Sequence, residues 1–283
     1  MAVPEHALQR YSRWATMLWT GVSSNPAEAW TYLGDYVARW REGFTDGAIY
    51  ATERDWEHQL HLSLDLSPAD DPTPEFWEVW SSVIADLKEK GIDAGPETYK
   101  EWNDGDAGLA RAIWCLVRVL RPNHVVETGV GHGVTSRVIL EALQRNGTGQ
   151  LWSIDRPPLE RQLEGHIGLA VGDKFKDRWT LLRGSSRRVL PGLLDRLGKI
   201  DLFVHDSLHT ARNVRFEVDH AWDALSDGGA IVIDDIDANP AFLGLRRGLS
   251  GSRSWVCEAE PLRPDLRRFN DKGVFGIILK GAL

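Results

Sequence analysis

Hydrophobic positions divide the chain into two parts with different periodicity. Up to about residue 105, apolar side chains recur at helical spacing and no strand-like run occurs. A helix beginning near Thr73 is predicted to continue to Gly91, because glycine commonly ends a helix. An earlier helix is predicted to carry an apolar stripe, expected to face the core, formed by Trp30, Leu33, Val37 and Trp40. The first part of the chain is therefore predicted to be all-helical.

From residue 106 onward, short apolar runs alternate with amphipathic helices, as they do in a parallel sheet with helical crossovers. The predicted strands are residues 124–128, 150–154, 179–182, 200–204, 230–233, 254–259 and 273–279. Only a short connection joins the last two. Because parallel neighbours need a long crossover, we expect these two to form an antiparallel hairpin at the sheet edge. Residues 106–283 thus form the predicted α/β domain, and residues 1–105 a helical cap or substrate lid.

Composition and charge exclude several classes of function. A formal net charge of −8 argues against a general affinity for nucleic acid or anionic membranes, since both require a positive surface. Cys115 and Cys257 lie among apolar residues, so both are expected to be reduced and buried. The sequence begins without the features of a secretory signal, and no apolar run is long enough to cross a membrane. We expect a cytoplasmic protein.

One glycine-rich segment lies between the first predicted strand and the helix that follows it. It runs from Glu127 to Gly133 and reads E-T-G-V-G-H-G. Such glycines let the backbone approach a ligand, and the helix after them presents free N–H groups. Val134 occupies the place of the third glycine of the dinucleotide fingerprint. A carboxylate at Glu127 would repel a pyrophosphate but attract the ammonium group of S-adenosylmethionine (SAM), so the segment favours SAM.

With this acid and its G-x-G-x-G segment, the sequence resembles the class I SAM-dependent methyltransferases over about residues 106–283. The resemblance implies a doubly wound, Rossmann-like sheet and an enzyme that uses SAM. Asp155, at the end of the second strand, is expected to accept hydrogen bonds from the ribose hydroxyls. In this family the segment Gly184, Ser185 and Ser186 would hold the adenine, although Ser185 replaces the usual acid. The remaining predicted cofactor contacts are Glu127, Thr128, Gly129, Gly131, His132, Gly133 and His205.

Three aspartates end neighbouring predicted strands. Asp206 follows the fourth strand, and Asp234 and Asp235 follow the fifth. Adjacent parallel strands deliver their carboxyl ends together, and three carboxylates so placed repel one another unless a cation such as Mg²⁺ lies between them. The spacing resembles that of the Mg²⁺-dependent small-molecule and sugar O-methyltransferases of the macrolide and aminocoumarin type. The alternative interpretation is that residues 234–240 form a solvated loop that caps a helix.

The general base implied by that resemblance is an aspartate, and its place is taken by Leu208. His209, the next residue, is the candidate that replaces it, because an imidazole accepts a hydroxyl proton near neutral pH. His209 and the metal-bound Asp206 are therefore the predicted catalytic residues. The alternative for His209 is a packing role at the start of a helix. The implied acceptor is a hydroxyl group of a small natural product or sugar.

The same residues are compatible with other functions. One is a metal-free N-, C- or O-methyltransferase that uses a histidine base. Two from different classes are a nicotinamide-dependent oxidoreductase and a non-catalytic SAM-binding protein. Tyr99 and Trp102 are candidates for covering the cofactor, by position alone. The resemblance also allows a homodimer, and the acceptor itself is not determined by the sequence.

Overall fold

The computed structural model describes residues 28–42, 48–91, 105–158, 161–260 and 273–281. Its helices are α2 (Ala29–Glu42), α3 (Trp56–Ser63), α4 (Thr73–Glu89), α5 (Ala107–Leu120), α6 (Val134–Asn146), α7 (Ser186–Leu197), α8 (Ala211–Ala224) and α9 (Ala241–Gly248). Its strands are β1 (His124–Thr128), β2 (Gln150–Asp155), β3 (Trp179–Arg183), β4 (Ile200–His205), β5 (Leu225–Ile233), β6 (Ser252–Glu258) and β7 (Val274–Lys280). Tyr99 and Trp102 lie outside the described residues.

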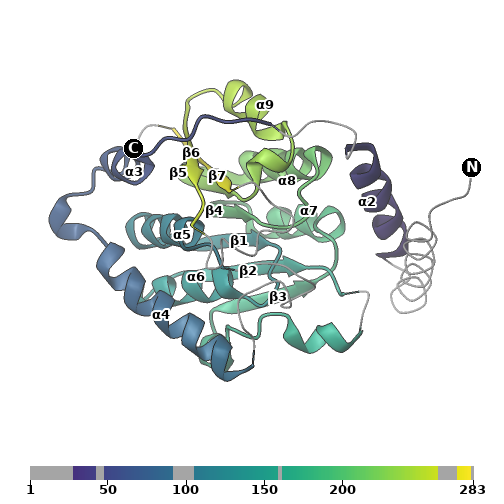
Figure 1. The fold of residues 1–283 in the computed structure, drawn as a ribbon, viewed down its shortest axis with the longest axis horizontal. Coiled ribbons are helices and arrows are strands. Elements are labelled where there is room, and N and C mark those ends of the chain that lie inside the picture. The colour runs from purple at the N-terminus through teal and green to yellow at the C-terminus, as the bar shows by residue number, and fades with distance from the viewer. Residues whose placement is uncertain (1–27, 43–47, 92–104, 159–160, 261–272, 282–283) are drawn as a thin grey trace, which may run out of the picture.

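The strands form one seven-stranded sheet in the order β3-β2-β1-β4-β5-β7-β6 (Figure 1). Strands β1 to β5 pair in parallel, and β7 pairs antiparallel with both β5 and β6. The predicted fold class and the antiparallel hairpin are confirmed. Because β7 lies between β5 and β6, it alone runs against the other strands. The order reverses between β1 and β4, which is where doubly wound sheets bind their ligands.

Helices cover both faces of the sheet (Figure 1). Helices α4, α5 and α6 enclose one hydrophobic core, and α7, α8 and α9 enclose the other. Successive strand residues alternate between the two, so that Val125 belongs to the first core and Val126 to the second. The central strands β1 and β4 read as apolar runs because they are buried on both faces.

Helices α3 and α4 belong to the first core. The Trp56 ring of α3 packs edge-on against Phe275 of β7 with ring centroids 5.4 Å apart. Phe76 of α4 stacks on Trp80 at 5.7 Å and approaches Trp114 of α5 at 6.4 Å. The tryptophan-rich part of the chain therefore contributes directly to the core of the sheet. The predicted division of the chain at residue 106 stays a prediction.

Helix α2 forms as predicted, but its apolar stripe does not face the core. Trp30 is 81% exposed, and Leu33 and Val37 are also exposed, whereas Tyr32 is buried. The inner face carries Asp35, whose carboxylate lies 2.6 Å from the Arg156 guanidinium. The predicted inward orientation was wrong, because polar contacts to the loops of the sheet decide which face of this helix is buried. The Trp40 side chain lies outside the described residues.

The two cysteines are buried and unpaired, as predicted. Burial raises the pKa of the Cys115 thiol to about 12, so both its burial and its protonation suit a packing role.

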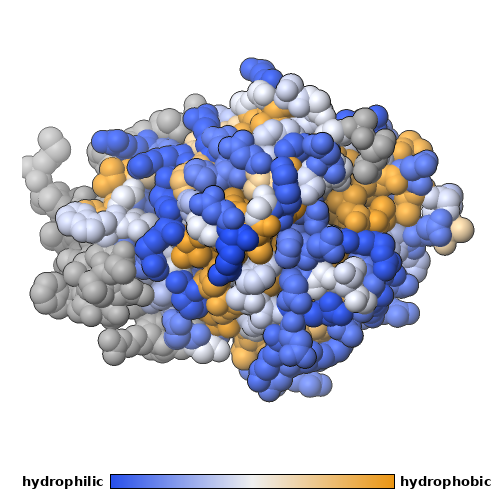
Figure 2. Space-filling view, turned by 180° about the vertical axis from the view of Figure 1, so that it is seen from behind, coloured by the Kyte–Doolittle hydropathy of each residue, from blue (hydrophilic) through white to orange (hydrophobic). Residues whose placement is uncertain are grey.

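On the face opposite to that of Figure 1, hydrophobic groups are interspersed among hydrophilic ones (Figure 2). None of the described helices combines the length and the apolar character needed to span a membrane.

Candidate active site

The glycine loop connects β1 directly to α6. Gly129, Gly131 and Gly133 all have positive φ angles, of 84°, 52° and 83°. A Cβ atom on Gly129 would lie 1.8 Å from the backbone oxygen of Asp206. Glycine is therefore required there, both for the left-handed backbone and for the close approach of β1 to the end of β4. The loop and the predicted metal-binding residues lie side by side.

Asp155 supports this loop from the end of β2. Its Oδ2 atom accepts hydrogen bonds from the backbone N–H groups of Val130, at 3.1 Å, and Gly131, at 3.2 Å. Burial raises the pKa of Asp155, although the neighbouring Arg183 opposes that rise. The carboxylate thus lies against the glycine loop, in the position from which the sequence predicts contact with a ribose.

Glu127 lies beneath the loop and is fully buried. Its Oε2 atom accepts hydrogen bonds from Ser136 Oγ at 2.6 Å and Ser153 Oγ at 2.7 Å. Burial raises the pKa of this carboxyl group to about 7. Its Oε1 atom is buried without a hydrogen-bond partner, and the expected contact of Glu127 with a ligand's ammonium group stays a prediction. The side chains of Thr128 and His132 are buried as well, so the outer surface of the loop is formed largely by backbone.

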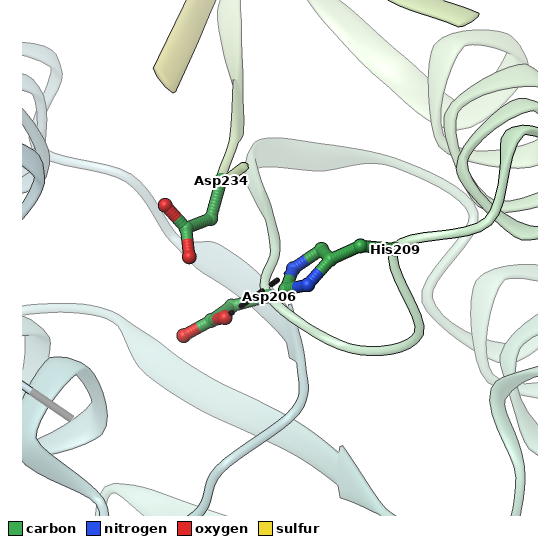
Figure 3. Close-up of side chains that lie close together, drawn as sticks. All are labelled: Asp206, His209 and Asp234. Atoms are coloured by element: carbon green, nitrogen blue, oxygen red, sulfur yellow. Dashed lines mark ion pairs between the residues drawn. The ribbon is translucent and has the colours of Figure 1, made fainter. Parts of the chain in front are cut away.

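Asp206, His209 and Asp234 converge beyond the ends of β4 and β5 (Figure 3). One potential ligand atom from each lies within 4.8 Å of the others. The alignment of the two strand ends has a simple cause, since the Asp234 N–H donates to the His205 carbonyl and the Asp206 N–H donates to the Thr128 carbonyl, both at 2.9 Å. Asp206 and Asp234 therefore come together as the parallel-sheet argument predicts.

Asp235 turns toward His209. Its backbone is left-handed, with φ of 47°, and its Oδ2 atom lies 3.4 Å from His209 Nδ1. The other ring nitrogen, Nε2, lies 3.7 Å from Asp206 Oδ1. Asp235 is not in the group that converges within 4.8 Å, and His209 is in it. Of the three aspartates predicted to bind a metal, the structure brings together two, with a histidine that was predicted to be a base.

The charges in this group strongly perturb one another. Burial, followed by the neighbouring carboxylates of Asp235 and Asp206, raises the pKa of Asp234 well above its ordinary value. Burial lowers the pKa of His209 to about 4, although the Asp235 carboxylate opposes the shift. A neutral imidazole therefore faces crowded carboxylates at neutral pH. A cation would relieve the repulsion between those carboxylates.

Behind this group lies a buried carboxylate that the sequence analysis missed. Glu217 of α8 approaches His205 Nδ1 with its Oε2 atom at 2.6 Å and is fully buried. It lies on the same face of α8 as Val214, Val218 and Ala221, which pack in the second core. The feature of the sequence that could have revealed Glu217 is its position as a single acid on the apolar face of a helix.

The end of β3 also has a partner that the sequence analysis missed. The N–H of Ser185 donates to Glu28 Oε1 at 3.1 Å, and Arg188 Nε donates to the same oxygen at 2.6 Å. Glu28 is distant in sequence and has no motif around it, so nothing in the sequence links it to Gly184 or Ser185.

Residues 126–236 match a protein-family model described as a methyltransferase domain. By this match the segment is similar to known methyltransferase domains. It spans the glycine loop, Asp155 and the group formed by Asp206, His209 and Asp234. The predicted class of enzyme, a SAM-dependent methyltransferase, is thus confirmed at the level of this domain. A comparison with curated proteins gave no match.

Solved structures share the fold of this methyltransferase domain. A putative O-methyltransferase from Klebsiella pneumoniae is similar at 16% identity, with a TM-score of 0.51, covering 81% of this chain and 97% of that one. The O-methyltransferase TomG from Streptomyces achromogenes, involved in tomaymycin synthesis and solved with SAM, has 17% identity and a TM-score of 0.50, covering 72% and 90%. Cofactor-bound Rv0187 from MTB has 17% identity and a TM-score of 0.51, covering 82% and 98%. At such identities the likeness establishes the fold alone.

Proposed function

We propose that this protein transfers the methyl group of SAM to a hydroxyl group of a small natural product or sugar, with the help of a divalent metal ion. The observation that carries the proposal is the convergence of Asp206, His209 and Asp234 directly beside the glycine loop. A methyl donor on the loop and an acceptor at the carboxylates would then be neighbours, as group transfer requires.

The cofactor would bind along the ends of β1 and β2. Backbone N–H groups of the glycine loop at the start of α6 would hold the carboxylate of its amino-acid part. Asp155 uses Oδ2 for the loop amides, and its Oδ1 would accept from the ribose hydroxyls. The SAM complex of TomG supports the same class of cofactor.

The metal ion, most simply Mg²⁺, would be held by Asp206 and Asp234, with Asp235 or His209 beside it. The donor set suits a hard divalent cation, because it offers two carboxylates with potential ligand atoms within 4.8 Å of each other. When bound, such an ion would act as a Lewis acid toward an acceptor hydroxyl. The two aspartates would orient the acceptor relative to the cofactor methyl group.

His209 would accept the hydroxyl proton. The nearest partner of its Nδ1 is Asp235, which favours the tautomer with the proton on Nδ1 and the lone pair on Nε2. The Nε2 atom is buried and has no hydrogen-bond partner in the structure. Burial lowers the pKa of His209 to about 4, so the ring is neutral at pH 7 with its lone pair available, and as a weak base it would depend on the metal ion to make the acceptor hydroxyl more acidic.

Calorimetry tests the cofactor and the metal without an acceptor. We expect S-adenosylhomocysteine (SAH) to bind the wild type at one site per chain, and Mg²⁺ or Mn²⁺ to bind the SAH-loaded protein. The Asp234→Asn variant should keep its affinity for SAH and lose at least tenfold in metal affinity. No binding of SAH to the folded wild type would refute the proposal.

A second candidate is methyl transfer without a metal, in which His209 alone activates the acceptor. It is favoured by the buried Nε2 atom of His209 within the group. SAH binding with no metal binding would select it. His209→Asn would then abolish transfer, and a chelator would have no effect.

A further inference from the structure

Helix α2 crosses the edge of the sheet at which β2 and β3 end. The Tyr32 hydroxyl donates to the Pro157 carbonyl, just after β2. The Arg156 guanidinium lies over the Tyr32 ring at 4.1 Å. Glu28, directly before α2, reaches the Ser185 amide after β3. The helix and the residue before it therefore contact the segments that follow both strands, and Glu28 makes the contact with the segment after β3.

The carboxylate of Glu28 is only half satisfied. Its side chain is fully buried, and Oε1 receives the hydrogen bonds from Ser185 and Arg188. Its Oε2 atom is buried without a hydrogen-bond partner. Although burial opposes ionisation, the hydrogen bonds from Ser185 and Arg188 lower the pKa of Glu28, so the group is an anion at neutral pH. The Ser185 hydroxyl is likewise buried without a hydrogen-bond partner, and since buried polar atoms are rarely left unpaired, this pair of groups indicates a polar ligand at the end of β3.

The backbone at Gly184 is shaped around this carboxylate. Its φ of 152° lies in a region that other residues rarely adopt, and a Cβ there would lie 2.5 Å from Arg188 Nη2 and 3.1 Å from Glu28 Oε1. The resemblance noted in the sequence would have an acid at position 185, where this chain has serine. A carboxylate from position 28 lies against the amide of that serine.

The sheet order indicates which part of the cofactor would reach Glu28. With the glycine loop after β1 and the ribose at Asp155 after β2, the next strand outward is β3. A purine attached to that ribose would extend toward Gly184 and Ser185. The exocyclic amino group of adenine is a hydrogen-bond donor, which is the partner that Oε2 lacks.

We propose that Glu28 is the residue that selects adenine, with Oε2 accepting a hydrogen bond from its exocyclic amino group. This inference rests on the proposed use of SAM. It assigns a specificity role to a residue far from the methyltransferase motifs, and it explains how the chain recognises adenine with a serine at position 185.

The test compares SAH with S-inosylhomocysteine, in which an oxo group replaces the amino group of adenine. Calorimetric titration of the wild type should give a preference for SAH of about 10- to 100-fold, because the oxo group would face a carboxylate. Glu28→Gln should weaken SAH binding about tenfold and reduce the preference to less than threefold, since an amide donates to the oxo group. Asp35→Asn, on the same face of α2, is the matched control and should leave the preference unchanged.

The outcomes separate this inference from the proposed function. Equal affinity of the wild type for the two ligands would overturn the role of Glu28, whether or not any variant folds. If folded Glu28→Gln keeps the preference for SAH over S-inosylhomocysteine, Glu28 only holds α2 against the segment after β3 and does not select adenine. Failure of the wild type to bind SAH would instead overturn the proposed function itself.

Discussion

Replacing Glu217 with glutamine should loosen the strand ends that carry the active site. The Glu217 carboxylate accepts hydrogen bonds from Thr128 Oγ1 at 2.5 Å, Ser207 Oγ at 2.7 Å and Asn213 Nδ2 at 2.8 Å, and it faces His205 Nδ1 at 2.6 Å. It thus joins β1, β4 and α8 through one buried group. Glutamine has the same shape, but it offers one oxygen and places an NH₂ group against donors.

The size of the effect follows from the pKa of Glu217. Burial alone would raise that pKa, but the His205 imidazole and the hydrogen bonds lower it from 4.5 to about 2. A lowering of this size corresponds to roughly 3 kcal/mol in the free energy of unfolding. Loss of a buried, charged hydrogen-bond acceptor is of the same order. For a chain of this length, the melting temperature should fall by about 6–12 °C.

Urea unfolding of the wild type and Glu217→Gln measures this difference, and its pH dependence tests the cause. An acid with a lowered pKa stabilises the folded state above its unfolded pKa, and the contribution is lost as the pH falls through its folded pKa. The difference between the two proteins should therefore be full at pH 5 and above and shrink as the pH falls from 4.5 toward 2.

Asp219→Asn is the control, because Asp219 is an exposed acid on the same helix. It should change the free energy of unfolding by less than about 0.5 kcal/mol. If Glu217→Gln behaves like this control, or if its destabilisation does not depend on pH below 4.5, the assignment of a stabilising carboxylate at the strand ends is refuted.

Three further changes test other parts of the site. Gly129→Ala should abolish SAH binding and destabilise the fold by more than about 3 kcal/mol in thermal denaturation, because its Cβ would collide with the Asp206 carbonyl. The control is Gly147→Ala, which also has a positive φ but has open space around it, and it should destabilise the fold by only about 1 kcal/mol. Asp234→Asn should raise the melting temperature of the metal-free protein at pH 7, because the raised pKa of Asp234 means that its charge destabilises the fold. The same variant should lose the increase in melting temperature that Mg²⁺ gives the wild type. A lower melting temperature of the metal-free variant would contradict the repulsion inferred between the carboxylates. Asp155→Asn should weaken SAH binding about 10- to 100-fold by calorimetry, and unchanged affinity would argue against a ribose contact.

The sheet could be predicted from the sequence because its strands are determined locally. The apolar runs of the central strands are buried on both faces, so these strands stand out from the amphipathic helices beside them. The glycine loop was equally visible, since positive φ at Gly129 requires that residue type. The convergence of Asp206 with Asp234 followed from the register of parallel strands, and the register shows the same alignment.

Side-chain orientation was less predictable. Asp235 was grouped with the metal ligands, but its left-handed backbone turns it toward His209. Glu127 was expected at a ligand, and Ser136 and Ser153 hold one of its two carboxylate oxygens beneath the loop. In both cases a neighbour distant in the chain, or a single backbone angle, decides where the charge points, and no periodic pattern records it.

The sequence by itself determined the strands, the glycine loop and the aspartates at the strand ends, because these depend on residue type and on spacing within one element. Only the tertiary structure decided where the side chains of Glu28 and Glu217 lie and that α2 turns its polar face inward. Glu28 meets Ser185 across 157 positions and Glu217 meets Thr128 across 89. Such contacts depend on how the elements dock, and docking is determined by the sum of many weak contacts rather than by any local pattern.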